Sequence, residues 1–79
     1  MENLKLIIAK NITELRRAAS MTQLDLAQKL NYSDKAVSKW ERAESVPDIS
    51  VLKSVAELFG VKVDNLITDH DDSVKAVND

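Results

Sequence analysis

The chain has 79 residues and a formal net charge of −2, enough for one small domain and too little for two. It contains no cysteine and one histidine, His70, so disulfides, thiolate zinc sites and multi-histidine metal centres are excluded. The longest apolar run, residues 6–9, is far shorter than the roughly 20 residues that cross a bilayer, and no secretory signal opens the chain. We therefore expect a soluble, cytoplasmic protein with no cofactor, no metal and no membrane partner.

The charges are distributed unevenly along the chain. Residues 1–43 carry eight Lys and Arg against five Asp and Glu, whereas residues 44–79 carry three Lys against eight Asp and Glu. A basic first half and an acidic second half indicate one face for phosphate and another for solvent. Ordinary variation between two solvated halves explains the charge distribution equally well.

Apolar residues recur at helical spacing through most of the chain. The first helix is expected over about residues 2–19, where five apolar residues share one face: Leu4, Ile8, Ile12, Leu15 and Ala19. Thr22 is predicted to cap the start of a second helix, with Asp25 in the capping-box position. That helix is expected to end at Asn31, because Asn tolerates the left-handed conformation that often ends a helix.

A third helix is predicted from Asp34 to about Arg42, with Ser33 as its N-cap and with Val37 and Trp40 facing inward. Only about three residues separate it from the second helix. Two short helices joined by so tight a turn form a helix-turn-helix unit, here over residues 22–42.

The rest of the chain predicts two further helices and an acidic tail. Asp48, after Pro47, is the expected N-cap of a fourth helix that ends at Gly60, and residues 61–67 form a short apolar fifth element. The fold class predicted is all-α, a compact bundle of about five helices in one domain, residues 1–67. Residues 68–79 are acidic and are expected to be disordered.

Specific residues within the second to fourth helices add to this pattern. Thr-Gln opens the second helix, Leu-Ala lies within it, Val-Ser-Lys-Trp-Glu forms most of the third, and Pro-Asp and Phe-Gly-Val flank the fourth. These residues, in the stretches MTQLDLAQKLNYSDKAVSKWERAESVPD and LKSVAELFGVKVDNLI, resemble the lambda-repressor-like (Cro/repressor, XRE-type) DNA-binding family over about residues 4–67. The resemblance implies a sequence-specific regulator of transcription, a repressor from a bacterium or phage, that binds double-stranded DNA.

The third helix is the expected recognition helix. Such a helix presents its N-terminal residues and its outward face to a major groove about 12 Å wide. The residues predicted to read bases are Ser33, Asp34, Lys35, Ser38 and Lys39. Lys35 and Lys39 stand four residues apart on one face and favour guanine O6 and N7. Asp34 either accepts from cytosine N4 or only stabilises the helix N-terminus, and the sequence leaves both roles open.

Three residues are predicted to contact DNA phosphate: Thr22, Gln23 and Arg42. Gln23 opens the second helix, where backbone N–H groups and the helix dipole attract an anion. The resemblance implies that Gln23 also buttresses the recognition helix. Thr22 serves as a plain N-cap or adds its hydroxyl to the phosphate, and the two roles are compatible. Arg42 is a candidate phosphate clamp at the other end of the recognition helix.

The resemblance also implies a structural ion pair and one departure from the family. Arg16 and Glu41 correspond to a partly buried pair that ties the first helix to the recognition helix. Ala43 stands where the family commonly has Gly, and a left-handed conformation there would cost about 1 kcal/mol. The loop that follows is therefore expected to differ in shape, and the acidic Glu44 to weaken DNA affinity.

One such domain contacts only a few base pairs, so we expect a homodimer on a palindromic operator with recognition helices about 34 Å apart. Either the apolar residues of the fifth element form the pairing surface, or they close the monomer core: Val61, Val63, Leu66 and Ile67. Two alternatives are a protein-interaction module of the antitoxin or coactivator type and the N-terminal domain of a longer regulator. The sequence offers no nucleophile–base pair, metal set or phosphate-binding glycine loop, so neither an enzyme nor a small-molecule substrate is expected.

Overall fold

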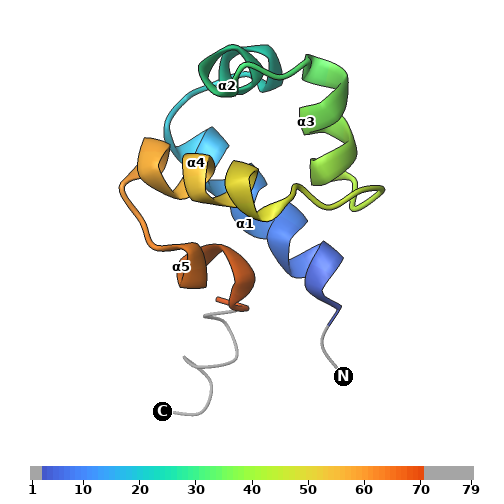
Figure 1. The fold of residues 1–79 in the computed structure, drawn as a ribbon, viewed down its shortest axis with the longest axis vertical. Coiled ribbons are helices and arrows are strands. Elements are labelled where there is room, and N and C mark those ends of the chain that lie inside the picture. Colours follow the sequence, from blue (N-terminus) through green and yellow to red (C-terminus); the bar gives the residue numbers. More distant parts are fainter. Residues whose placement is uncertain (1–2, 71–79) are drawn as a thin grey trace.

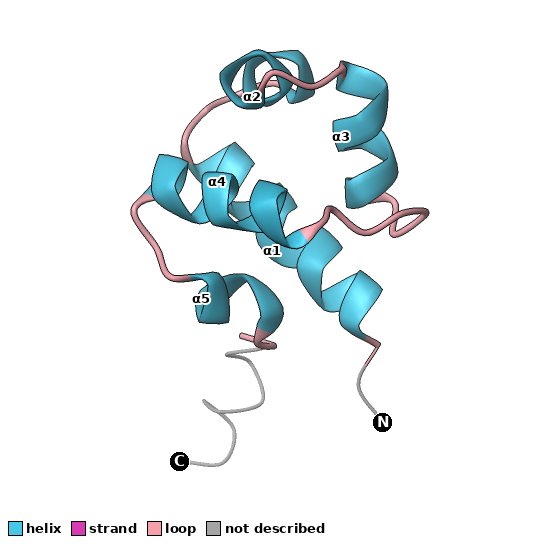
Figure 2. Ribbon diagram, in the orientation of Figure 1, coloured by secondary structure: helices cyan, strands magenta, loops and turns pink. Residues whose placement is uncertain are grey.

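The computed structural model describes residues 3–70, and most of them are helical (Figure 1). The five helices are α1 (Leu4–Ala18), α2 (Gln23–Leu30), α3 (Asp34–Glu41), α4 (Ile49–Phe59) and α5 (Val63–Ile67). Figure 2 shows that loops make up the remainder of the described chain, which contains no strand. The predicted all-α fold of about five helices is confirmed.

The helix-turn-helix unit lies at one end of the molecule. In Figure 1, α2 and α3 pack against each other at the top, α1 and α4 run through the middle, and α5 lies at the bottom. α1 contacts both α3 and α5, so it connects the two ends of the bundle. The position of α3 therefore depends on what holds it to α1.

One hydrophobic core joins all five helices. Its members are Ile8, Ile12, Leu26, Ala27, Val37, Trp40, Val51, Leu52, Val55, Ala56 and Leu66. Burying one such aliphatic or aromatic side chain contributes about 1.5–3 kcal/mol. Val37 and Trp40 of α3 are almost completely buried, which confirms their predicted inward orientation.

The apolar residues of the fifth element pack into this core. Leu66 is fully buried, and Val61, Val63 and Ile67 are half-buried and pack against the core cluster. Of the two interpretations that the sequence left open, the structure supports the monomer core.

The ends of α1 differ from the sequence prediction. The helix begins at Leu4, because Asn3 is its N-cap and accepts a hydrogen bond from the Leu6 N–H at 3.3 Å; Glu2 lies outside the described residues. Leu4 is 49% exposed and Ala19 is exposed at the C-cap. The first and last residues of the predicted apolar face therefore extend beyond the core.

Asn11 is a structural residue that the sequence analysis did not single out. It is 5% exposed, and the two hydrogens of its side-chain amide are shared among three backbone carbonyls: Asn65 at 3.2 Å, Leu66 at 2.8 Å and Thr68 at 2.9 Å from the amide nitrogen. The carbonyls at the C-terminal end of a helix lack intrahelical partners. Asn11 therefore caps α5 from α1 and fixes the short helix in place.

The predicted N-caps of the internal helices are confirmed. Thr22 and Asp25 form a reciprocal capping box, with 2.9 and 3.0 Å hydrogen bonds, at the start of α2. Ser33 accepts from the Ala36 N–H at the start of α3, and Asp48 accepts from the Val51 N–H at the start of α4. Each cap satisfies a backbone N–H that the helix itself leaves without a partner.

Four helices end with the same left-handed step. The residues with positive φ are Ser20 (57°), Asn31 (60°), Ala43 (59°) and Gly60 (68°). After each one, the next N–H reaches back to a carbonyl near the helix end: Met21 to Arg16, Tyr32 to Ala27, Glu44 to Lys39 and Val61 to Ala56. These are Schellman-type ends. Two of the four positions hold residues for which positive φ is strained, since Ser and Ala have a Cβ and lack the local bonding of Asn.

The described part of the acidic segment lies against the bundle. The Thr68 hydroxyl donates to the Asp64 carbonyl at 2.7 Å, Asp69 lies 3.9 Å from Lys10, and the His70 Nε2 lies 2.8 Å from the Asn65 carbonyl. Residues 71–79, the rest of the predicted tail, are outside the described residues. Within residues 3–70, no helix is long and apolar enough to cross a membrane, and no three His, Cys, Asp or Glu side chains form a metal cluster.

We expect Ala43→Gly to stabilise the protein by about 1 kcal/mol, because Gly removes the strain of the left-handed step. In a chain of this size the midpoint of thermal unfolding should rise by about 4–8 °C. The matched control is Ala19→Gly. Ala19 has an unstrained φ of −88°, so Gly there relieves no strain and should destabilise the folded protein by increasing the conformational entropy of the unfolded chain. Equal effects of the two variants in thermal denaturation would show that the left-handed Ala43 is not strained.

Candidate nucleic-acid interface

The turn between α2 and α3 sets the angle of the helix-turn-helix. Asn31 adopts the left-handed conformation, and the chain enters α3 through Tyr32 and the N-cap Ser33. The Tyr32 ring packs on the Trp40 ring at a centroid distance of 5.5 Å and an interplanar angle of 59°. Trp40 is 5% exposed. Trp40 is therefore a core residue, as expected, against which Tyr32 of the turn packs, and its ring is not free to stack on a base.

Anchoring α3 through its inward residues leaves a polar face toward solvent. Of the side chains predicted to read bases, Ser33, Asp34, Lys35 and Lys39 are exposed, and Ser38 is half-buried. Lys35 and Lys39 lie one turn apart, so their ammonium groups can reach the same short stretch of duplex. The structure thus brings all five predicted residues to the N-terminal part and outer side of one helix.

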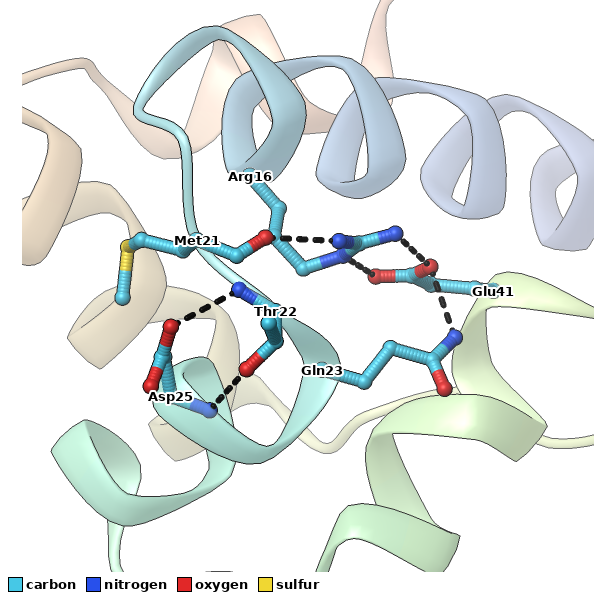
Figure 3. A network of polar contacts seen from close by, with 6 residues as sticks. All are labelled: Arg16, Met21, Thr22, Gln23, Asp25 and Glu41. Atoms are coloured by element: carbon cyan, nitrogen blue, oxygen red, sulfur yellow. Dashed lines mark hydrogen bonds and ion pairs between the residues drawn. The ribbon is translucent and has the colours of Figure 1, made fainter.

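A polar network of three side chains and one backbone carbonyl holds the C-terminal end of α3 (Figure 3). Arg16 of α1 donates from Nε and Nη2 to the two carboxylate oxygens of Glu41, at 2.7 and 3.0 Å. The Arg16 Nη1 donates to the Met21 carbonyl at 2.7 Å, and the Gln23 amide donates to Glu41 Oε1 at 3.0 Å. One carboxylate on α3 is therefore bound by α1 and α2 together.

The ion pair between Arg16 and Glu41 is shielded from solvent, and each group shifts the pKa of the other. Arg16 and Glu41 side chains are 11% and 6% exposed. Burial pushes the pKa of Glu41 upward, but hydrogen bonds from Arg16 and Gln23 outweigh it and bring the pKa below its ordinary value. The hydrogen bond to Glu41 raises the pKa of Arg16. Both groups therefore remain charged, and each depends on the other for its partner.

The N-terminus of α2 has backbone N–H groups that make no hydrogen bond within the helix. Its capping box occupies the N–H groups of Thr22 and Asp25, while no described acceptor takes those of Gln23 and Leu24. Two N–H groups at a helix N-terminus can bind an anion. Asp25 opposes this attraction, because hydrogen bonds from Thr22 hold the pKa of its carboxyl below the ordinary value and keep it ionised.

Arg42, the predicted phosphate clamp, is engaged by the chain itself. Its guanidinium donates to the Glu44 carboxylate at 2.6 and 3.2 Å, and to the Ser38 hydroxyl. The hydrogen bond from Arg42 lowers the pKa of the Glu44 carboxyl. The acidic character of Glu44 predicts weaker DNA affinity, but the sequence pattern alone did not predict its pairing with Arg42. The proximity of the two residues in sequence was the available signal.

The chain matches the helix-turn-helix family over residues 12–66, which is more than half of its length. The chain belongs to the helix-turn-helix family. This confirms the predicted lambda-repressor-like, XRE-type resemblance.

Three relatives come from different organisms. The chain is 34% identical over 59 residues to the HTH-type transcriptional activator BcrR of Enterococcus faecalis, covering 75% of this chain and 29% of BcrR. It is 33% identical over 60 residues to the HTH-type transcriptional regulator ImmR of Bacillus subtilis, covering 76% and 47%. It is 30% identical over 63 residues to multiprotein-bridging factor 1c of Arabidopsis thaliana, covering 80% and 43%. The aligned segment thus spans less than half of each relative.

Solved structures show the same fold. A hypothetical transcription factor, NHTF from Neisseria, superposes with a TM-score of 0.83 at 23% identity, over 94% of this chain and 85% of that one. Hydroxypropylphosphonic acid epoxidase from S. wedmorenis superposes with a TM-score of 0.77 at 20% identity, over 85% of this chain and 36% of the epoxidase. At these identities the similarity concerns the fold alone.

We expect Arg16→Met to destabilise the protein by about 3 kcal/mol, because it leaves the Glu41 carboxylate buried without its main partner. Arg17→Met, at the exposed neighbouring position, should change stability by less than about 0.5 kcal/mol. The double variant Arg16→Met, Glu41→Leu should recover most of the loss. Urea unfolding measures all three, and a small effect of Arg16→Met would show that the pair does not hold α3 in place.

Proposed function

We propose that the chain is a sequence-specific double-stranded DNA-binding regulator that inserts α3 into the major groove. Ser33, Asp34, Lys35, Ser38 and Lys39 would read bases. Thr22 and Gln23 would contact phosphate, and so would Arg42 when its guanidinium is released from Glu44. We further propose that it acts in the cytoplasm as a homodimer on a palindromic operator and is not an enzyme. Repression, which requires only that a bound protein block access to the duplex, is the form of regulation proposed.

The observation that carries this proposal is that α3 is fixed on its inner face and exposed on its outer face. Its inner face is held by the core and by the Glu41 network, and its outer face presents Lys35 and Lys39 to solvent. A rigid helix with lysines on its free face meets the requirements for reading guanine in the major groove. The regulators among its relatives support the same assignment and support the absence of catalysis.

The second candidate is a protein-interaction module of the antitoxin or coactivator type on the same fold. A helix that binds protein more often exposes large apolar side chains. None of the described residues of α3 is an exposed large hydrophobic, although Leu24 and Tyr32 nearby are 52% and 46% exposed. The composition of α3 therefore favours DNA. The greater length of the relatives also supports a third possibility, that the chain is the DNA-binding domain of a longer regulator.

The test is selection of bound sequences from a pool of random duplexes at about 0.1 M salt, where the Debye length is about 10 Å. We expect a palindrome whose half-site centres lie about one helical turn apart. Enrichment of a single short half-site would contradict the homodimer but keep the DNA-reading role. No enrichment by folded protein would reject the proposal in favour of the protein-interaction module.

Lys35→Ala and Lys39→Ala should each lower the ratio of affinity for the selected duplex to affinity for random duplex by about tenfold. One good base contact contributes about 1–3 kcal/mol of discrimination. The control is Lys62→Ala, which removes the same charge from an exposed position beside α5, at the opposite end of the molecule (Figure 1). If the ratio fell equally in all three variants, or in none, Lys35 and Lys39 would not read bases.

A further inference from the structure

At the C-terminal end of α3, the guanidinium of Arg42 forms an ion pair with the carboxylate of Glu44. Arg42 Nε donates to Glu44 Oε2 at 2.6 Å and Arg42 Nη2 to Glu44 Oε1 at 3.2 Å, so the contact is bidentate. The third nitrogen, Nη1, donates to the Ser38 hydroxyl. All three guanidinium nitrogens thus have acceptors within the chain, although the Arg42 and Glu44 side chains are 54% and 53% exposed.

The backbone explains why Glu44 reaches Arg42. Ala43 takes the left-handed step, and the Glu44 N–H then bonds to the Lys39 carbonyl at 2.9 Å. This turns the chain back along the end of α3 and brings a carboxylate two residues away onto the guanidinium. The contact follows from the helix end itself, and its position next to Ser38 puts it on the proposed DNA face.

A DNA phosphate would use the same edge of Arg42. The paired oxygens of a carboxylate and of a phosphodiester both match the guanidinium fork, so only one of them can occupy the Nε–Nη2 edge at a time. Exposed ion pairs contribute little to folding stability. The pair is therefore poorly explained as a stabilising device, and its partners can exchange.

We propose that Glu44 is an intramolecular competitor for DNA phosphate, which occupies Arg42 and thereby lowers the affinity of the domain for duplex regardless of sequence. This inference rests on the proposed DNA-binding function and deepens it. Phosphate contacts carry no sequence information, whereas base contacts do. Glu44 therefore lowers the sequence-independent part of the affinity and leaves the ratio of affinities for selected and random duplex unchanged.

The first test compares Glu44→Gln with the parent chain on random and on selected duplex over a range of salt concentrations. Glu44→Gln should bind both duplexes more tightly, by about three- to tenfold at 0.1 M salt, and its salt slope should steepen by about 0.9, the value of one added phosphate contact. The control is Glu57→Gln, which removes the same charge from an exposed position on α4 and measures the effect of net charge alone.

The second test repeats the comparison in an Arg42→Ala background. There Glu44→Gln should have no more effect than Glu57→Gln, because the guanidinium for which carboxylate and phosphate compete is gone. Equal salt slopes for Glu44→Gln and Glu57→Gln in the parent, or a Glu44→Gln effect that persists without Arg42, would overturn the inference while duplex binding stands. If the folded parent binds no duplex at any salt concentration, the proposed function fails, and this inference with it.

Discussion

The pairing of Arg16 with Glu41 is the contact on which the geometry of α3 depends. α3 is only eight residues long, too short to be stable alone. Val37 and Trp40 fix its inner face, but apolar contacts lack direction and leave its rotation loosely defined. The bidentate ion pair supplies the missing direction, and Gln23 extends it to α2. The two helices of the proposed DNA face are thereby oriented by a single carboxylate.

The four left-handed residues fix the point at which each helix ends and the direction in which the chain continues. Ser20, Asn31, Ala43 and Gly60 all take the same left-handed step, although Gly suits it best. At Ala43 the strained step has a specific consequence, because it carries Glu44 back onto Arg42. A strained backbone position can persist where the surrounding structure determines it. Here the strain coincides with the segment that meets the proposed phosphate contact.

Local signals made most of the fold predictable from the sequence. Thr22, Ser33 and Asp48 cap the helices that they were expected to cap, because a capping bond spans only three residues. Asn11 could not be predicted, because its acceptors lie 54–57 residues further along the chain. The partner of Arg42 was equally undetermined, since a guanidinium binds phosphate and carboxylate alike and sequence alone does not say which is nearer.

Acidic residues on the proposed DNA face have local roles that oppose phosphate binding. Asp25 completes the capping box of α2, Asp34 lies in the first turn of α3, and Glu44 occupies Arg42. A carboxylate stabilises a helix N-terminus for the same reason that a phosphate binds there, so the two compete for one site. A DNA-binding face built in this way would bind any duplex weakly. Contacts from Lys35 and Lys39 to base edges would then supply a larger share of the total affinity, while the ratio of affinities for selected and random duplex would stay the same.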